Sequence, residues 1–412
     1  MPAARPTASP CARRAKLTAV ATAAALFTAA CSGVVAPGDG QSASQPALLL
    51  ALAVLGTENG RPAPMPARLG ILTQGPQGWS HRFINDADSN VFHKAMVFGD
   101  EGVLTFAGTA AAVKLWRPDG SVDTLWQQDF GGAFSRMRDA EVGDVFGDGS
   151  TAIAVATHDQ GVVAVLRPDG AGGYEALELD RKADTYVHEI EIGDLDGDGT
   201  LEIYATPSEP NQLDGTPQPG TVVRYVPAAS EGRVEVADLG DRHAKEILVT
   251  DIDGDGSDEL YVSVEAVSGG RVEIRRYLAD TDPAAGEVIA TLDDRLCRFL
   301  TAGDVDGDGS REMVAAAGGS GLWLLRPAEG EWHKELIDAQ SSGFEHASVL
   351  VDFDGDGRDE LYVASDAQKQ VRRYTLGDGG WQHEVLLEYS DDLGRFTWNI
   401  MPARSGLLPD GS

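Results

Sequence analysis

The stretch GDLDGDGTLEIYATP, residues 193–207, places four carboxylates and three glycines in its first ten positions and then turns apolar. No lysine or arginine lies within the stretch to neutralise these charges. Crowded carboxylates repel one another, so such a loop folds poorly unless a cation joins it. Nearly the same pattern returns at 250–264, 303–317 and 351–364. The stretch is therefore one copy of a repeated unit.

The repeat has a period of 48 to 57 residues. Aligned on the first aspartate of the loop, four full copies, one degraded copy and one faint copy begin at Asp194, Asp251, Asp304, Asp352, Asp144 and Met96. Each unit reads as an alternating strand, the glycine-rich loop and three further short strands, with almost no helical periodicity. Four strands in each unit predict the blades of a β-propeller.

The two ends of the chain are expected to share one blade. Six complete blades occupy residues 91–394, while 47–55 and 68–86 read as the second, third and fourth strands of another and 394–402 as its first strand. Such a blade closes the ring and removes its open strand edges. The expected fold is an all-β propeller of seven four-stranded blades over 47–404, followed by a tail at 405–412; six or eight blades are the alternatives.

The loop itself predicts a calcium site. Numbered from its first aspartate, it has Asp at positions 1, 3 and 5, Gly at 4 and 6, and Glu at 9. Ca²⁺ takes six to eight oxygen ligands and tolerates irregular geometry, and the glycines permit a tight turn. An EF-hand would need Glu at position 12, which is instead an apolar residue within a predicted strand: Ala205, Val262, Ala315 or Val363.

These repeats resemble the FG-GAP or VCBS repeats of integrin α-subunit propellers and bacterial surface proteins. In that family the loop between the first two strands of a blade holds one Ca²⁺ ion. For this chain the resemblance implies four calcium sites, formed by Asp194, Asp196, Asp198 and Glu202; Asp251, Asp253, Asp255 and Glu259; Asp304, Asp306, Asp308 and Glu312; and Asp352, Asp354, Asp356 and Glu360. The copies at Asp144 and Met96 are expected to be metal-free.

A basic or histidine residue recurs six positions before the first aspartate of most copies. The set is Arg138, His188, Lys245, Arg298 and His346, with Arg395 in the terminal blade. Asn90 interrupts the series in the Met96 blade. These positions are expected at the mouth of the central channel, on the face opposite the loops. They either bind an anionic ligand such as an acidic glycan or pair with acidic neighbours such as Asp139, Glu189 and Glu246.

Residues 1–30 resemble the signal peptide of a bacterial lipoprotein. Arg13, Arg14 and Lys16 precede an apolar run at 17–30 that is too short to span a bilayer. The run ends at Cys31, which resembles the lipidated cysteine of such proteins; an ordinary secretory signal is the alternative. Residues 31–46 are small and polar and predict a flexible tether. The expected location is the bacterial outer membrane or cell surface, through a lipid anchor only.

The net charge and the lack of catalytic motifs exclude several classes of function. The net charge of −32 becomes −36 when residues 1–30 are removed, which argues against nucleic acid as a partner. The sequence has no nucleophile elbow, histidine-rich metal motif or phosphate loop, so no catalytic residue is assigned. The expected function is a monomeric calcium-binding module for a glycan or an extracellular protein. A polysaccharide lyase or hydrolase on the same scaffold and a structural envelope protein are the alternatives.

Overall fold

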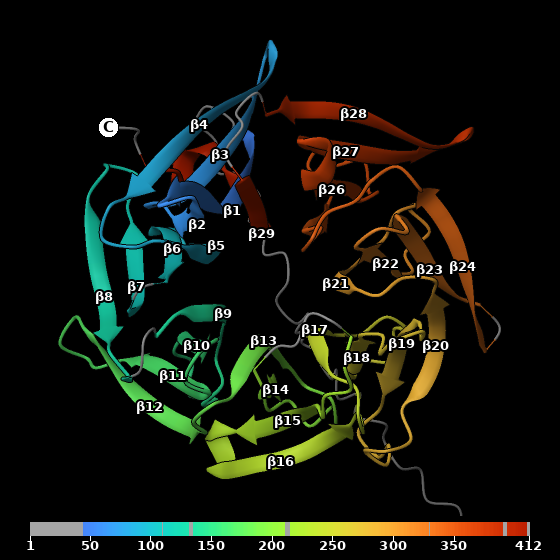
Figure 1. Ribbon diagram of the computed structural model, residues 1–412, viewed down its shortest axis with the longest axis horizontal. Coiled ribbons are helices and arrows are strands. Elements are labelled where there is room, and N and C mark those ends of the chain that lie inside the picture. The colour runs from blue at the N-terminus through green and yellow to red at the C-terminus, as the bar shows by residue number, and fades with distance from the viewer. Residues whose placement is uncertain are drawn as a thin grey trace, which may run out of the picture. The chain divides into compact units, whose positions relative to one another are not determined.

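Seven antiparallel β-sheets stand around a central axis in the computed structural model (Figure 1). The structure describes residues 44–108, 110–131, 135–210, 215–328, 330–389 and 394–409. The predicted signal peptide, Cys31 and most of the predicted tether lie outside these residues. Within the described ranges, no helix is long and apolar enough to cross a membrane.

Six sheets are each built from four consecutive strands. The first three are β5 (Phe92–Phe98), β6 (Gly102–Ala107), β7 (Ala111–Trp116), β8 (Val122–Gln128); β9 (Met137–Gly143), β10 (Ala152–Thr157), β11 (Val162–Pro168), β12 (Tyr174–Arg181); and β13 (Tyr186–Gly193), β14 (Glu202–Ser208), β15 (Thr221–Val226), β16 (Glu231–Asp238). The next three are β17 (Ala244–Thr250), β18 (Glu259–Val264), β19 (Val272–Tyr277), β20 (Glu287–Leu292); β21 (Cys297–Gly303), β22 (Glu312–Ala317), β23 (Leu322–Ala328), β24 (Glu331–Asp338); and β25 (Ser348–Val351), β26 (Glu360–Ser365), β27 (Gln370–Gly377), β28 (Gly380–Glu388). Two short 3₁₀ helices, η1 (Pro227–Ala229) and η2 (Asp366–Gln368), lie in loops.

The seventh sheet joins the two ends of the folded chain. β29 (Gly394–Arg404) pairs antiparallel with β1 (Pro46–Glu58), which also pairs with β3 (Ala67–Gly75), and β3 pairs with β4 (Gly78–Asp86). The prediction of a seven-bladed propeller closed by both termini is confirmed. The far end of β1 also forms a hairpin with β2 (Arg61–Pro64), which the sequence did not indicate. The 3₁₀ helix η3 (Ser405–Leu407) follows β29, and Leu408 packs into the core.

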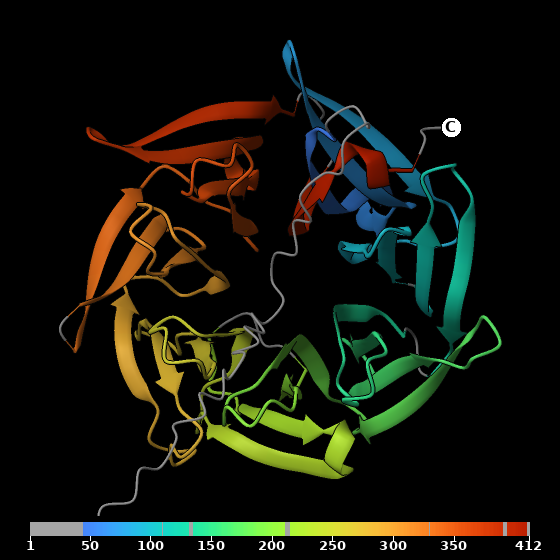
Figure 2. The same ribbon diagram turned by 180° about the vertical axis from the view of Figure 1, so that it is seen from behind.

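The first strand of every blade lies next to the axis. Around the ring, β29, β5, β9, β13, β17, β21 and β25 contact one another in that order and return to β29. The fourth strands β4, β8, β12, β16, β20, β24 and β28 lie on the outer rim, as Figures 1 and 2 show from opposite sides. Residues at the start of a first strand can therefore meet residues from several other blades.

The apolar core lies between neighbouring blades rather than inside any one sheet. Every residue of the second strands β10 and β22 is buried, because another blade covers each face of these sheets. The outer strands are mostly exposed instead, and Leu177 of β12 and Val385 of β28 are 44% and 45% exposed. The contrast explains why second strands are continuous apolar runs while fourth strands carry charge.

Closure of the ring generates the first prediction. Ile400 of β29 is buried against Leu48 and Leu50 of β1, so residues from the two chain ends share one core. Ile400→Ala should lower the free energy of unfolding by about 2–5 kcal/mol, measured by urea denaturation. The exposed Val385→Ala should change it by no more than about 0.5 kcal/mol. Equal effects of the two substitutions would show that the closing blade adds nothing to stability.

Candidate functional site

The four predicted aspartate loops each bring their three aspartates together. They join the first and second strands of four consecutive blades, from β13–β14 to β25–β26. In each loop, carboxylate oxygens of the aspartates at positions 1, 3 and 5 lie within 4.8 Å of one another. The four groups are Asp194, Asp196 and Asp198; Asp251, Asp253 and Asp255; Asp304, Asp306 and Asp308; and Asp352, Asp354 and Asp356.

The turn is held by hydrogen bonds from backbone N–H groups to aspartate side chains. In the β21–β22 loop, Asp304 Oδ1 accepts from Gly307 N at 2.7 Å and Oδ2 accepts from Gly309 N at 2.8 Å. Both glycines have positive φ, 76° and 89°, which a side chain would strain. Asp308 Oδ1 in turn accepts from Ser310 N at 2.8 Å. The first aspartate therefore shapes the loop as well as offering oxygen atoms inside it.

The glutamate at position 9 has a different place from its three aspartates. Glu202, Glu259, Glu312 and Glu360 are each no more than 6% exposed. Their carboxylates accept the backbone N–H of position 2, which is Leu195, Ile252, Val305 or Phe353. Burial, with the nearby Asp253 carboxylate, raises the pKa of Glu259 to about 7. The position-9 carboxylate thus fastens the loop to the blade beside the aspartates.

An arginine from the third strand partly neutralises three of the loops. Arg326 of β23 lies 2.5 Å from Asp306 and 3.1 Å from Glu312. Equivalent arginines pair Arg224 with Glu202 at 2.9 Å and Arg276 with Asp253 at 3.8 Å. These contacts were not expected, because the arginines lie outside the loop sequences. Each loop still carries more carboxylates than cationic partners.

The degraded loop has the same turn without the full set of acids. Asp144 accepts hydrogen bonds from the backbone of Asp148 and Gly149, and Asp148 accepts from Ser150 N. Position 3 is Phe146, and the Arg167 guanidinium lies 5.4 Å from its ring centroid. Turn geometry alone therefore does not require three aspartates, which makes this loop an internal control.

Aspartates at position 8 of two loops bind the loop of the preceding blade, which the loop pattern in the sequence did not indicate. Asp258 Oδ2 accepts from Asp194 N at 2.7 Å, and Asp359 Oδ2 accepts from Asp304 N at 2.8 Å. The backbones of the same residue pairs are also hydrogen-bonded. Each of these aspartates couples the loop of its own blade to the loop of the blade before it. Glycines directly before the loops leave room for this approach, since a Cβ at Gly303 would lie 2.3 Å from the Asp359 carboxylate.

The oxygen atoms of the aspartate triads fit Ca²⁺ chemically. Each triad offers only hard carboxylate oxygens, and no nitrogen or sulfur ligand belongs to the four groups found in the described part of the chain. The triads are half-buried to exposed and therefore open to solvent ions. The donor set suits Ca²⁺ better than Zn²⁺, which prefers imidazole and thiolate.

At the opposite end of the first strands, a β-bulge recurs. The pairing of first and second strands skips one residue at His93, Arg138, Lys245, Arg298 and Trp398, and skips across His188 and Glu189 in β13. A bulge re-aims the side chain of the extra residue. Because all first strands surround the axis, these side chains meet there.

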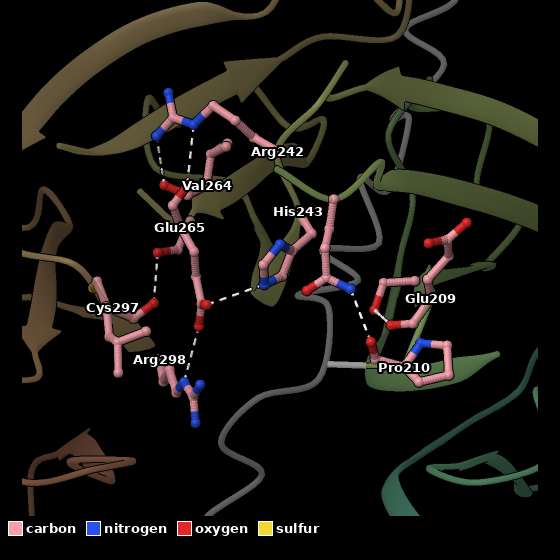
Figure 3. Close-up of polar contacts among 12 residues, drawn as sticks. Glu209, Pro210, Arg242, His243, Val264, Glu265, Cys297 and Arg298 are labelled. Carbon is pink, nitrogen blue, oxygen red and sulfur yellow. Dashed lines mark hydrogen bonds and ion pairs between the residues drawn. The ribbon is translucent and has the colours of Figure 1, made fainter. Parts of the chain in front are cut away.

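The residues that meet form what we call the axial cluster: Arg138, His188, Lys245, Glu265, Arg298, Glu345 and Trp398. Arg298 donates to Glu265 Oε1 and Glu345 Oε1, both at 2.9 Å. Arg138 Nη2 lies 3.4 Å from Glu345 Oε2, and its guanidinium lies 5.0 Å from the Trp398 ring centroid. Figure 3 shows Glu265 between Arg298 and His243, whose Nε2 lies 3.1 Å from Glu265 Oε2.

The structure corrects three details of the predicted basic series. His346 points away from the axis, with its ring nitrogens 2.7 Å from Ala317 O and from Ser341 Oγ; the preceding Glu345 reaches the axis instead. In β5 the loop is shortened, because Phe98 pairs directly with Gly102, so His93 rather than Asn90 takes the bulge position. In β29 that position belongs to Trp398; the Arg395 side chain lies outside the described residues.

The predicted pairing partners are also different. Arg138 and Arg298 do pair with acids, but with Glu345 and Glu265 from other blades rather than with Asp139, Glu189 or Glu246. The interaction between Arg138 and Glu345 joins residues 207 positions apart. Only the closed ring brings such residues together, so no local sequence signal marks the pair.

Burial sets the protonation of the axial cluster. It lowers the pKa of Lys245 to about 7 and that of His188 well below its ordinary value. Burial alone would raise the pKa of Glu265, but the His243 hydrogen bond and the Arg298 charge hold it at about 2. Glu265 and Arg298 are therefore ionised at pH 7, whereas His188 is neutral.

Lys245 generates a prediction on stability. Its Nζ has no hydrogen-bond partner and its side chain is 2% exposed, so at pH 7 the buried charge opposes folding. Lys245→Met should raise the free energy of unfolding at pH 7 by about 1–4 kcal/mol. The unfolded chain binds more protons than the folded one between pH 7 and 10, so the advantage should shrink over that range. A variant less stable than wild type would show that Lys245 supports the fold.

Comparison with known proteins agrees with the architecture. Residues 304–363, which span the loops at Asp304 and Asp352, match the family model described as FG-GAP-like repeat. No curated protein sequence is significantly similar to the chain.

Similar solved structures share the fold at low sequence identity. They include a protein from Lactobacillus plantarum (TM-score 0.54, 11% identity, covering 87% of this chain and 99% of that one) and the Dos1 propeller (0.52, 10%, 84% and 86%). Saccharomyces cerevisiae Sqt1 is a third (0.50, 12%, 82% and 83%). The chain is thus a seven-bladed β-propeller that carries an FG-GAP-like repeat at residues 304–363.

Proposed function

We propose that this chain is an exported, calcium-binding β-propeller that acts as a binding module for a glycan or an extracellular protein. The observation that carries the calcium assignment is the repetition of one aspartate triad at the same loop of four consecutive blades. Each triad places three carboxylates in a loop between two strands, although such a loop can form without them. The degraded loop makes the same turn with Phe146 in place of the second aspartate, so the triads serve something other than the turn.

Bound Ca²⁺ would supply positive charge to carboxylates that otherwise repel one another. The chain's own residues set the rest of the arrangement. The first aspartate of the loop fixes its backbone, the position-9 glutamate fastens the loop to the blade, and Asp258 and Asp359 connect neighbouring loops. An ion that binds only the folded state stabilises it by about 2.7 kcal/mol when its concentration is a hundred times Kd.

Two further features support a binding role outside the cell. The axial cluster contains buried donors without partners, which is typical of a site completed by a ligand. Cys297 is a free, buried thiol, and the other two cysteines lie in residues 1–31, so calcium would provide the cross-links that disulfides give many exported proteins. The sequence before Cys31 supports a lipid anchor that holds the propeller at the bacterial surface.

The calcium assignment is tested by two matched substitutions. Asp308→Asn changes position 5 of a complete triad, and Asp148→Asn changes the same position of the degraded loop. Both aspartates are exposed and accept a hydrogen bond from the backbone N–H of the serine two positions later. The calcium concentration should be about a hundred times Kd. Under that condition, Asp308→Asn should lower Tm by a few degrees and Asp148→Asn should not. EDTA should lower Tm of the wild type by many degrees, and Mg²⁺ should restore it poorly.

Calcium would be the wrong ion if excess EDTA left the melting curve of the wild type unchanged. If Asp308→Asn and Asp148→Asn lowered Tm equally in calcium, the triad would not be the ion site, because only one of these loops has a triad. In EDTA the two variants should melt alike, which separates loss of ion binding from loss of a turn hydrogen bond.

The anchor has its own test. Cys31→Ser removes the sulfur that would carry lipid, so the variant should move from the membrane fraction to the soluble fraction or stay unprocessed. Fractionation followed by mass spectrometry of the mature N-terminus measures both outcomes. Cys297→Ser serves as the control for loss of a thiol. A wild-type protein recovered soluble and without lipid would rule out the anchor.

A further inference from the structure

Two nitrogen atoms of the axial cluster, on Lys245 and Arg298, are donors without an acceptor, and a third, on His188, has no hydrogen-bond partner of either kind. Lys245 Nζ, Arg298 Nη2 and His188 Nε2 are buried and lack a hydrogen-bond partner, and their side chains are 2%, 4% and 2% exposed. They come from the bulges of three consecutive blades. Unpartnered buried donors are costly, so the Lys245 and Arg298 nitrogens together indicate a missing acceptor.

The charges of the cluster point to one acceptor of negative charge. Arg138 and Arg298 are balanced by Glu265 and Glu345, with which they form ion pairs. Lys245 then remains without an ion-pair partner, since none of the salt bridges found among the described residues includes it. A single carboxylate would compensate this charge and accept hydrogen bonds from its neighbours.

The acids one position further along the same strands do not fill this role. Asp139 forms an ion pair with Lys94 at 3.0 Å and accepts a hydrogen bond from Ile190 N. Burial raises the pKa of Glu189 and Glu246 well above its ordinary value, so these side chains hold protons more firmly than free glutamate does. Asp139, Glu189 and Glu246 are therefore not available to compensate the charge of Lys245.

A cavity of about 430 Å³ lies beside the cluster, within the range of small-molecule sites. Phe344 and Phe396 line it, with ring centroids 5.3 Å apart. The Arg298 guanidinium lies 4.2 Å from the Phe344 centroid, so one aromatic ring separates the cavity from the unpartnered Nη2. The carboxylate of Asp294 in the cavity wall is already occupied by the backbone N–H groups of Gly319 and Ser320.

We propose that this site binds a small sugar acid, either a free hexuronate or the uronate end of a glycan. Its carboxylate accepts from Lys245 Nζ and Arg298 Nη2, and the apolar face of its ring packs against Phe344 and Phe396. Because Phe344 lies over the Arg298 guanidinium, entry of the carboxylate requires this ring to turn aside. The inference rests on the glycan-binding part of the proposed function and gives that part a ligand class and a position.

Isothermal titration calorimetry of the calcium-saturated protein with D-galacturonate tests the proposal, and D-galactose and acetate are the comparison ligands. Galacturonate should bind at one site per chain, and both others should bind at least about tenfold more weakly. Lys245→Met should weaken galacturonate about tenfold or more, because it removes a charged hydrogen bond. The exposed Lys182→Met should leave affinity unchanged. Arg298 is unsuitable for substitution, because its loss would leave the buried Glu265 and Glu345 without this ion-pair partner and would destabilise the fold.

Each outcome decides a separate part of the proposal. Galactose binding as tightly as galacturonate would overturn the carboxylate contact, and acetate doing so would overturn the contact with the sugar ring. Unchanged affinity in Lys245→Met would place the ligand elsewhere; if that variant does not fold, Lys245→Gln takes its place. If neither galacturonate nor D-glucuronate binds while EDTA still lowers Tm, this site is wrong and the calcium assignment stands.

Discussion

Repulsion among the aspartates of the four loops is the constraint on which the proposed account depends. Three carboxylates lie within 4.8 Å of one another in each of four consecutive blades, and an arginine from the third strand offsets only part of that charge in three of them. The loops are also connected, because Asp258 and Asp359 each bind the backbone of the preceding loop. A change in the charge of one loop therefore acts on its neighbour. Cations in the four triads would relieve repulsion in four of the seven blades.

The other end of the first strands shows how the ring creates a site that no single blade contains. A β-bulge in each of six innermost strands re-aims one side chain, and closure by β1 and β29 brings these side chains to a common axis. Glu265 and Glu345 balance the two arginines there, while Lys245 remains without an acceptor. The aspartate triads thus lie at one end of the first strands, and the unpartnered donors of the axial cluster lie at the other end.

Much of this architecture could be predicted from the sequence, because strand alternation and the loop pattern are local and repeat with one period. The seven blades, the closing blade and the twelve aspartates of the triads could be predicted for this reason. Features that depend on other blades could not be predicted in the same way. Glu345 pairs with Arg138 across 207 positions, and the arginines of the third strands lie far from the loops that they neutralise. The loop after β5 is short, so aligning its sequence with the other repeats places the bulge position three residues too early and misses His93. Trp398 was missed because it is not basic.

The number of calcium ions bound per chain shows most directly whether the triads are metal sites. The purified protein, dialysed against calcium and then against metal-free buffer, can be measured by inductively coupled plasma mass spectrometry together with its amino-acid content. We expect four calcium ions per chain, one for each triad, and three in the Asp308→Asn variant. A wild-type protein that holds no calcium, or one whose calcium content is the same in the variant, would contradict the assignment of the triads as metal sites.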